Sequence, residues 1–185
     1  ECDCPNNHHG KLISIFFSNA KSLWFMSEKQ KETYENKFNF LKKSNSFVLS
    51  SVFDTKTLDI LRNLKENKDN KWVILNSPSW IKNVAGCIKH AKNNNLPYEL
   101  VWGLKYSELL SKLSKSRGLI FLPLDSDTCP RIVIEAKLLD CELNINENVL
   151  HKDEEWFCGS KEKMLDYLSS NASFFWNITE KGYAL

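Results

Sequence analysis

Six short apolar runs alternate with longer amphipathic segments, and this alternation constrains the fold more than any other feature. The runs are rich in β-branched and aromatic residues and cover 22–26, 47–52, 71–76, 98–102, 118–124 and 141–146. Helical spacing of apolar residues covers 10–20, 27–41, 55–67, 79–95, 105–115, 129–140 and 160–170. Strands that alternate with helices predict βαβ units. We therefore expect an α/β protein with a doubly wound, mostly parallel, six-stranded Rossmann-like sheet that carries helices on both faces.

Composition excludes several classes of protein. The 185 residues suit one compact unit, and 42% hydrophobic with 26% charged residues is typical of a folded globular chain. The net charge of +2 comes from basic and acidic residues spread along the chain, so no basic stripe predicts nucleic-acid binding. No apolar stretch approaches about 18 residues, so we expect no transmembrane segment. The chain begins with Glu1 and shows no signal peptide, which favours a cytoplasmic piece of something longer.

The cysteines divide into two groups. Four of them stand singly and predict free thiols in a reducing compartment: Cys87, Cys129, Cys141 and Cys158.

The other two belong to the first residues, ECDCPNNHH. Cys2, Cys4, His8 and His9 are competent metal ligands, but their spacing matches no common structural zinc site, so we favour a polar terminus and expect no metal.

The turns after the strands are the places to look for a site, because ligands of parallel sheets bind at the carboxyl ends of the strands. Only six glycines occur, and none forms a dinucleotide fingerprint, a P-loop or a nucleophile elbow. A dinucleotide dehydrogenase, a P-loop NTPase, a kinase and a common α/β-hydrolase are therefore excluded. A flavodoxin-like cofactor binder is disfavoured, because no phosphate loop rich in Gly, Ser or Thr follows the first strand.

The turn NSPSWIKN follows the strand predicted over 71–76. Ser79 is a natural N-cap for the next helix, which places Lys82 in its first turn, where a cation opposes the helix dipole. Such a lysine either binds an anion at the helix N-terminus or points into water.

The turn PLDSDTCPR follows the strand predicted over 118–124. Asp127 or Thr128 can cap the next helix, and Pro130 suits its first turn. Glu135 lies about two turns further along, on the side of the cap. It either pairs with Arg131 on a solvated face, or faces a ligand held over the helix N-terminus together with Asp127.

The segment Asp127-Thr-Cys-Pro-Arg-Ile-Val-Ile-Glu135-Ala136 resembles the acidic-x7-Glu signature of retaining GT-B glycosyltransferases of the family 4 type. The runs GLIFLPLDS, AKLLDCELNIN and VILNSPSWIKN resemble neighbouring parts of that family's nucleotide-sugar-binding half, in the right order. SLWFMSEKQKETYENKF resembles the end of the acceptor half. The resemblance therefore implies that 1–45 end an acceptor half and that 46–185 form one half of a GT-B architecture.

The resemblance also implies roles for particular residues. Glu135 would bind the nucleotide ribose, and Lys82 would meet the diphosphate. Asp127 would hold the donor sugar, and Ser77, Ser79 and Arg131 would lie nearby in the binding site. The backbone of Thr128, Cys129 and Pro130 would complete the sugar site.

Two departures from the family pattern leave alternatives open. Ser77 stands where the family has an arginine, and Pro130 removes a backbone donor. The implied reaction is metal-independent transfer of a sugar, with retention, from a nucleotide-diphosphate sugar to a glycan or lipid-linked acceptor, with a missing N-terminal acceptor domain as partner. The enzyme would lie in the cytoplasm or peripherally at the inner membrane face. The alternative is a non-catalytic module that binds a nucleotide sugar or a protein.

Two stretches near the C-terminus remain. The acids of HKDEEWF (151–157) either neighbour the acceptor or belong to a solvated surface loop, and we favour the surface loop. Phe174, Phe175 and Trp176 form an aromatic tail after the last helix, which we expect to pack against the chain itself.

Overall fold

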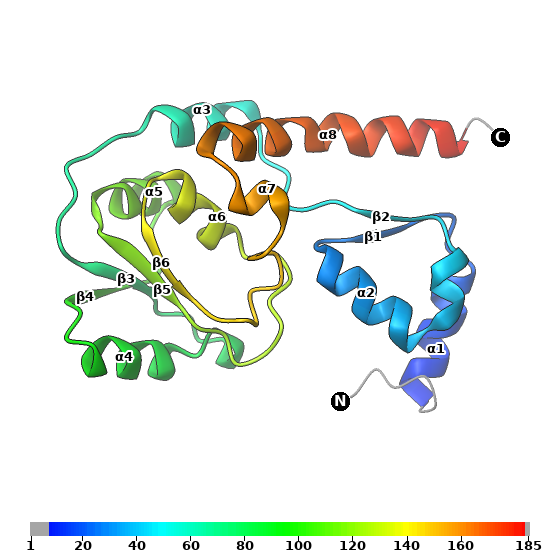
Figure 1. Cartoon of the computed structure of the whole chain (residues 1–185), viewed down its shortest axis with the longest axis horizontal. Coiled ribbons are helices and arrows are strands. Elements are labelled where there is room, and N and C mark those ends of the chain that lie inside the picture. The colour runs from blue at the N-terminus through cyan, green and yellow to red at the C-terminus, as the bar shows by residue number, and fades with distance from the viewer. Residues whose placement is uncertain (1–7, 184–185) are drawn as a thin grey trace.

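Two separate parallel sheets organise the chain, and the computed structural model describes residues 8–183 (Figure 1). The larger sheet has four strands in the order β4-β3-β5-β6, and every pair of neighbours is parallel. Its strands are β3 (Trp72–Leu75), β4 (Tyr98–Val101), β5 (Gly118–Phe121) and β6 (Glu142–Ile145).

Helices cover both faces of the four-stranded sheet because successive side chains of a strand point to opposite faces. On one face, Trp72, Ile74 and Ile120 pack against α4 (Val84–Asn93). On the other face lies the larger core, which includes Val73, Leu119 and Phe121. The helices that contribute to it are α3 (Thr55–Asn63), α5 (Tyr106–Lys115), α6 (Arg131–Leu138), α7 (Glu155–Cys158) and α8 (Lys161–Tyr183).

The expected single six-stranded sheet is wrong. Each predicted strand region overlaps a strand, the one over 47–52 by only two residues, but β1 (Leu23–Phe25) and β2 (Ser46–Val48) pair only with each other. Between them run α2 (Glu28–Lys37) and the 3₁₀ helix η1 (Asn39–Lys43), and the pair has its own apolar core. The chain then leaves this unit through residues 49–54 and, after α3, begins the second sheet with β3. No strand of one sheet pairs with a strand of the other.

Helices lie on both sides of the small sheet. On one side α1 (His8–Ser18) packs Ile13 and Phe17 against the core formed around Leu23 and Phe25, to which α2 and η1 also contribute.

On the other side lies the far half of α8, which extends from the large sheet to the small one (Figure 1). The Trp24 ring lies 6.0 Å from Phe174 and 5.1 Å from Phe175, centroid to centroid. The aromatic segment therefore continues the last helix instead of following it. Phe174 and Phe175 contact the small sheet, while Trp176 is 59% exposed.

The helix expected from residue 79 starts later. Ser79 precedes only a 3₁₀ turn, η2 (Trp80–Lys82), and α4 begins after Asn83. Asn83 adopts a left-handed conformation, with φ of 51°, and its side chain accepts a hydrogen bond from the Gly86 N–H at 3.2 Å. Asparagine tolerates this conformation and caps helices well, so it, rather than Ser79, sets the start of α4.

The thiol prediction is confirmed for the four single cysteines. Cys87, Cys129 and Cys141 are buried and Cys158 is exposed, and all four are free. Within residues 8–183, each helix is too short or too polar to cross a bilayer.

Candidate functional site

The loops that follow β3, β5 and β6 are joined at the carboxyl edge of the large sheet. In the loop after β3, the carbonyl of Ile81 accepts a hydrogen bond from the Leu124 N–H at 2.9 Å. The Asn83 side chain donates to the Leu122 carbonyl at 2.8 Å. In the loop after β6, the Asn146 side chain donates a hydrogen bond to the Pro123 carbonyl at 2.9 Å. The loop after β5 is thus fixed from both sides.

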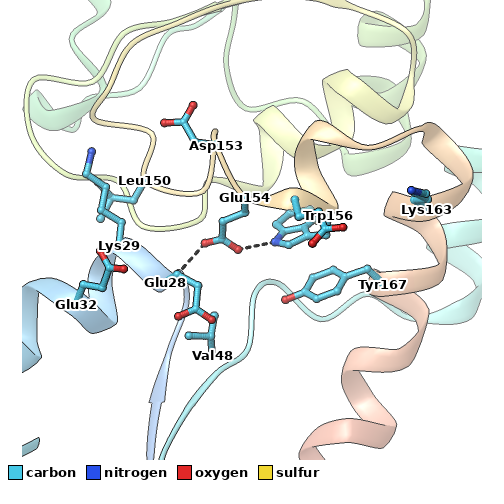
Figure 2. Close-up of a pocket in the computed structure, with 11 residues that line it drawn as sticks. Glu28, Lys29, Glu32, Val48, Leu150, Asp153, Glu154, Trp156, Lys163 and Tyr167 are labelled. Carbon is cyan, nitrogen blue, oxygen red and sulfur yellow. Dashed lines mark hydrogen bonds between the residues drawn. The ribbon is translucent and has the colours of Figure 1, made fainter. Parts of the chain in front are cut away.

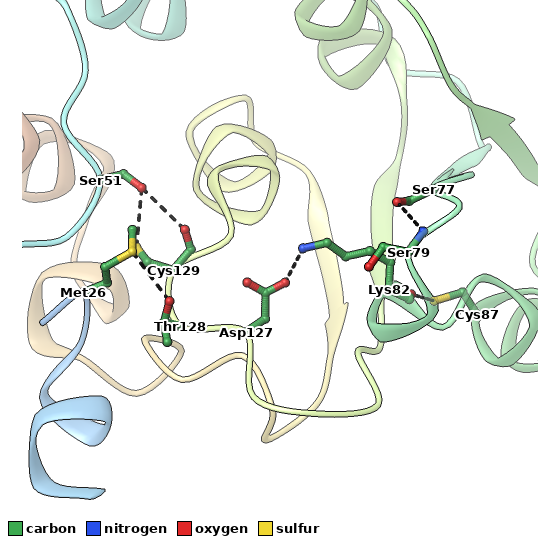
Figure 3. A network of polar contacts seen from close by, with 9 residues as sticks. All are labelled: Met26, Ser51, Ser77, Ser79, Lys82, Cys87, Asp127, Thr128 and Cys129. Atoms are coloured by element: carbon green, nitrogen blue, oxygen red, sulfur yellow. Dashed lines mark hydrogen bonds and ion pairs between the residues drawn. The ribbon is translucent and has the colours of Figure 1, made fainter. Parts of the chain in front are cut away.

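Lys82 and Asp127 meet across these loops (Figure 3). The Lys82 Nζ lies 2.5 Å from Asp127 Oδ2, and both side chains are partly shielded from solvent. Asp127 is held in place by its backbone, which donates to the Asn148 carbonyl at 2.8 Å and accepts from the Leu150 N–H at 3.1 Å. The structure therefore brings together the cation and the carboxylate that were expected at a diphosphate and at a sugar.

The N-terminus of α6 differs from the expectation that Asp127 or Thr128 would cap it. The cap position is Pro130, which has no side-chain hydrogen bond to offer. Asp127 pairs with Lys82 instead, and the Thr128 hydroxyl contacts the Met26 sulfur at 3.6 Å. Within residues 8–183, no side chain caps the first turn of α6, although the Val133 N–H donates to the Pro130 carbonyl at 3.0 Å. Free amides at a helix N-terminus favour an anion.

Cys129 connects this loop to the segment between the two sheets. The Ser51 hydroxyl lies 3.5 Å from the Cys129 carbonyl oxygen and 3.6 Å from its sulfur (Figure 3). Burial raises the pKa of the Cys129 thiol, so it stays protonated and is a poor nucleophile. Its backbone, rather than its sulfur, is what a ligand at α6 could meet.

Glu135 is buried, with 2% of its surface exposed, so the interpretation of a solvated face is wrong. The Tyr106 hydroxyl donates to Glu135 Oε1 at 2.8 Å, and Arg131 Nε lies 3.4 Å from the same oxygen. Among the described residues, none forms a hydrogen bond to Oε2. Burial raises the pKa of Glu135, and the bonds from Tyr106 and Arg131 partly oppose that rise. The i, i+4 pair with Arg131 exists, but it leaves one carboxylate oxygen for a further donor.

Tyr106 was not found from the sequence, and no motif marks it. It follows β4 at the start of α5, and its pKa is raised by burial and by the charge of Glu135, so its hydroxyl remains a donor. Arg131 is also held by stacking, with its guanidinium 4.2 Å from the centre of the Phe53 ring. Glu135 is therefore oriented by residues from two further elements.

Exposed aromatic side chains surround this edge. Trp80, on the turn after β3, is 68% exposed, and Trp102, directly after β4, is 57% exposed. Flat exposed rings on loops beside polar side chains are suited to stacking on a planar ligand such as a nucleobase. No motif in the sequence marks this placement.

The serines predicted for the site lie on the loop after β3. The Ser79 N–H donates to the Ser77 hydroxyl at 3.2 Å, which shapes the turn (Figure 3). Lys82 is the cation of this loop, since Ser77 brings no charge to it.

A concavity of about 970 Å³ lies away from this edge, between α2 and the start of α8 (Figure 2). Glu154 crosses it: Oε1 accepts from the Glu28 N–H at 2.9 Å, and Oε2 accepts from the Trp156 ring nitrogen at 2.5 Å. Burial raises the pKa of Glu154. Glu154 therefore joins the unit of the small sheet to that of the large one.

The expectation that 151–157 form a solvated loop holds only for Asp153 and Glu155, which are exposed. His151 and Phe157 are buried, and His151 stacks on Trp156 with the ring centres 5.6 Å apart. Trp156 stacks in turn on Tyr167 of α8 at 4.7 Å. The acidic residues made the segment look solvated, but its rings anchor it.

The candidate metal ligands of the sequence lie at the N-terminus, where Cys2 and Cys4 fall outside the described residues. Within 8–183, no group of three or more His, Cys, Asp or Glu side chains is arranged to hold a metal ion.

No protein-family model matches the chain, and no curated protein matches it significantly.

Proposed function

We propose that the chain binds a nucleotide-diphosphate sugar at the carboxyl edge of the large sheet and serves as the donor-binding part of a retaining glycosyltransferase. The observation that carries this proposal is the convergence of Lys82, Asp127 and the uncapped N-terminus of α6. Glu135 lies on the same helix and keeps one oxygen available. Lys82 and the amides of α6 suit a diphosphate, Asp127 suits a sugar, and Glu135 suits a ribose.

The chemistry follows from these contacts. The donor diphosphate displaces Asp127 from Lys82, and Asp127 then accepts a hydrogen bond from a sugar hydroxyl. The bond from the sugar C1 to the diphosphate oxygen breaks while the acceptor oxygen bonds to C1 on the same face, and the acceptor proton passes to the departing phosphate. Lys82 and the α6 amides stabilise the charge that develops on the diphosphate, without a metal.

Glu135 binds the ribose. Its Oε2 accepts a hydrogen bond from a ribose hydroxyl, while Tyr106 and Arg131 orient the carboxylate through Oε1. Trp80 and Trp102 offer faces for the base. The proposed architecture is a Rossmann-like half of a GT-B enzyme, with an acceptor domain as partner. The donor domain would start near residue 50 rather than at the expected residue 46, because 46–48 form β2 of the small sheet.

The proposed location is the cytoplasm, with peripheral attachment at the inner membrane face. The free thiols of Cys87, Cys129 and Cys141 agree with a reducing compartment. The acceptor would be a glycan or a lipid-linked saccharide.

A second candidate is a non-catalytic module that binds a nucleotide sugar without turnover. Ser77 favours it, because a single lysine on this loop offers less charge to a leaving diphosphate than the lysine and arginine of the resembled family.

Calorimetric titration tests the binding that both candidates share. UDP, GDP and ADP, with UDP-glucose and GDP-mannose, are titrated into the wild type, Glu135→Ala and Asp59→Ala. Asp59 is a matched control, an exposed helix carboxylate paired with Arg62 at 3.6 Å. We expect micromolar to low-millimolar binding of one nucleotide, weakened by about 1–3 kcal/mol in Glu135→Ala and unchanged in Asp59→Ala. No binding of any of these compounds, or equal binding by both variants, would refute the site.

Sugar transfer separates the two candidates. A labelled nucleotide sugar that binds and is never consumed, with any of a panel of glycan and lipid acceptors, favours the non-catalytic module.

A further inference from the structure

The outward side of α1 carries three large apolar residues that nothing in the described structure covers. Leu12 is 53% exposed, Ile15 is 61% exposed and Phe16 is 72% exposed. Residues three and four apart share one face of a helix, so these side chains form one continuous ridge. Ile13 and Phe17 lie on the opposite side and pack against the small sheet. The helix is thus apolar on its inner and its outer face. Single exposed hydrophobic residues are common on protein surfaces, but a contiguous apolar ridge marks an interaction site.

The unit that carries the ridge is basic, whereas the rest of the chain is not. Residues 8–49 contain seven lysines and three glutamates, while 50–185 contain equal numbers of basic and acidic residues. Lys11 is exposed on α1 itself, and Lys42 and Lys43 are exposed on η1, which packs against α1. One of these lysines therefore lies on the helix of the ridge, and two lie on the 3₁₀ helix that contacts it.

We propose that the outer face of α1 docks on an anionic membrane surface. Leu12, Ile15 and Phe16 would enter the boundary between headgroups and acyl chains, and Lys11, Lys42 and Lys43 would meet the lipid phosphates.

Lipid explains both properties of this face better than a protein partner does. Protein interfaces are depleted of lysine, whereas anionic membranes attract it, and an apolar ridge flanked by lysines is typical of helices that lie in the interface plane. Because α1 has only three turns, neither the ridge nor the charge suffices alone, and both contribute to binding. This inference does not depend on the proposed sugar transfer.

Vesicle sedimentation with the full chain tests it. The vesicles contain either phosphatidylcholine alone or phosphatidylcholine with about one-third phosphatidylglycerol. The variants are Leu12→Ser/Ile15→Ser/Phe16→Ser for the ridge and Lys42→Ala/Lys43→Ala for the charge.

Matched controls come from the other unit. Ile60→Ser/Leu100→Ser changes exposed apolar residues there, and Lys65→Ala/Lys71→Ala changes exposed lysines. Circular dichroism confirms that each variant is folded.

We expect binding to the anionic vesicles only, with partitioning reduced at least about tenfold in the ridge variant. The lysine variant should lose about fivefold per lysine, and raised salt should weaken wild-type binding. Both controls should bind like the wild type.

Three results would overturn the proposal. One is no sedimentation with anionic vesicles at millimolar lipid. Another is equal loss of binding in the ridge and control variants. The third is a wild-type dimer, seen by light scattering, that the ridge variant converts to a monomer, because a second copy would then cover this face. If the ridge variant does not fold, the lysine variant and the salt dependence decide.

Discussion

His151 makes the stability of the fold sensitive to mild acid. Its side chain is fully buried, and neither ring nitrogen has a hydrogen-bond partner in the described structure. The backbone of Thr128 lies near the ring but does not reach normal hydrogen-bond geometry, and the charge of Lys137 also disfavours an imidazolium. Burial, the largest cause, therefore lowers the pKa of His151 from 6.5 to about 4.

The sign and size of the effect follow from that shift. Between about pH 6.5 and pH 4 the unfolded chain binds a proton at His151 that the folded chain does not, so stability falls as the pH falls. At about 1.4 kcal/mol per pKa unit, the full loss is about 3 kcal/mol. Burial raises the pKa of Glu135 and Glu154, so these groups change stability in the opposite sense. Comparing the wild type with a variant that lacks His151 therefore isolates the contribution of this histidine to the pH dependence of stability.

Urea unfolding of the wild type and of His151→Phe measures the effect across this pH range. Phenylalanine keeps a ring for the stack on Trp156, so the variant should fold and should lose about 3 kcal/mol less on acidification. His151→Leu serves as a second variant that cannot titrate. Equal pH dependence in the wild type and both variants would refute the reasoning.

Two further substitutions test contacts that support the site and the helices. Tyr106→Phe removes the donor to Glu135 Oε1, so we expect about 0.5–1.5 kcal/mol lower stability and weaker nucleotide binding; an unchanged urea midpoint and unchanged calorimetric affinity would show that the bond is unimportant. Lys68→Met removes the ammonium that donates to the Leu139 carbonyl at 2.7 Å, at the end of α6, and we expect a loss of about 1–2 kcal/mol by thermal or urea unfolding. A matched Lys65→Met should change stability by less than about 0.5 kcal/mol, and an equal loss there would contradict the capping role.

The sequence predicted the elements better than their assembly. Every predicted strand region overlaps a strand, because β-branched and aromatic runs between helical patterns are a local signal. Which strands pair is decided by long-range contacts, such as those of Trp24 with Phe174 and Phe175 on α8. No local pattern could show that β1 and β2 form a sheet of their own.

The site divides in a similar way. The meeting of Lys82 and Asp127 agrees with the rule that the turns after parallel strands lie together. The start of α4 was misplaced because Asn83 competes with Ser79 as a cap, and propensity does not rank two good caps. Tyr106 was missed because it meets Glu135 only once α5 packs on α6, which no spacing in the sequence encodes.

A crystal structure with bound nucleoside diphosphate would locate the donor site, using UDP, GDP and ADP in turn at millimolar concentration. We expect the diphosphate within about 3 Å of Lys82 Nζ and of the first amides of α6, with a ribose hydroxyl on Glu135 Oε2. Asp127 should have moved away from Lys82. A nucleotide bound instead in the concavity beside Glu154, or a site in which Lys82 and Asp127 stay paired while the phosphates lie elsewhere, would contradict this expectation.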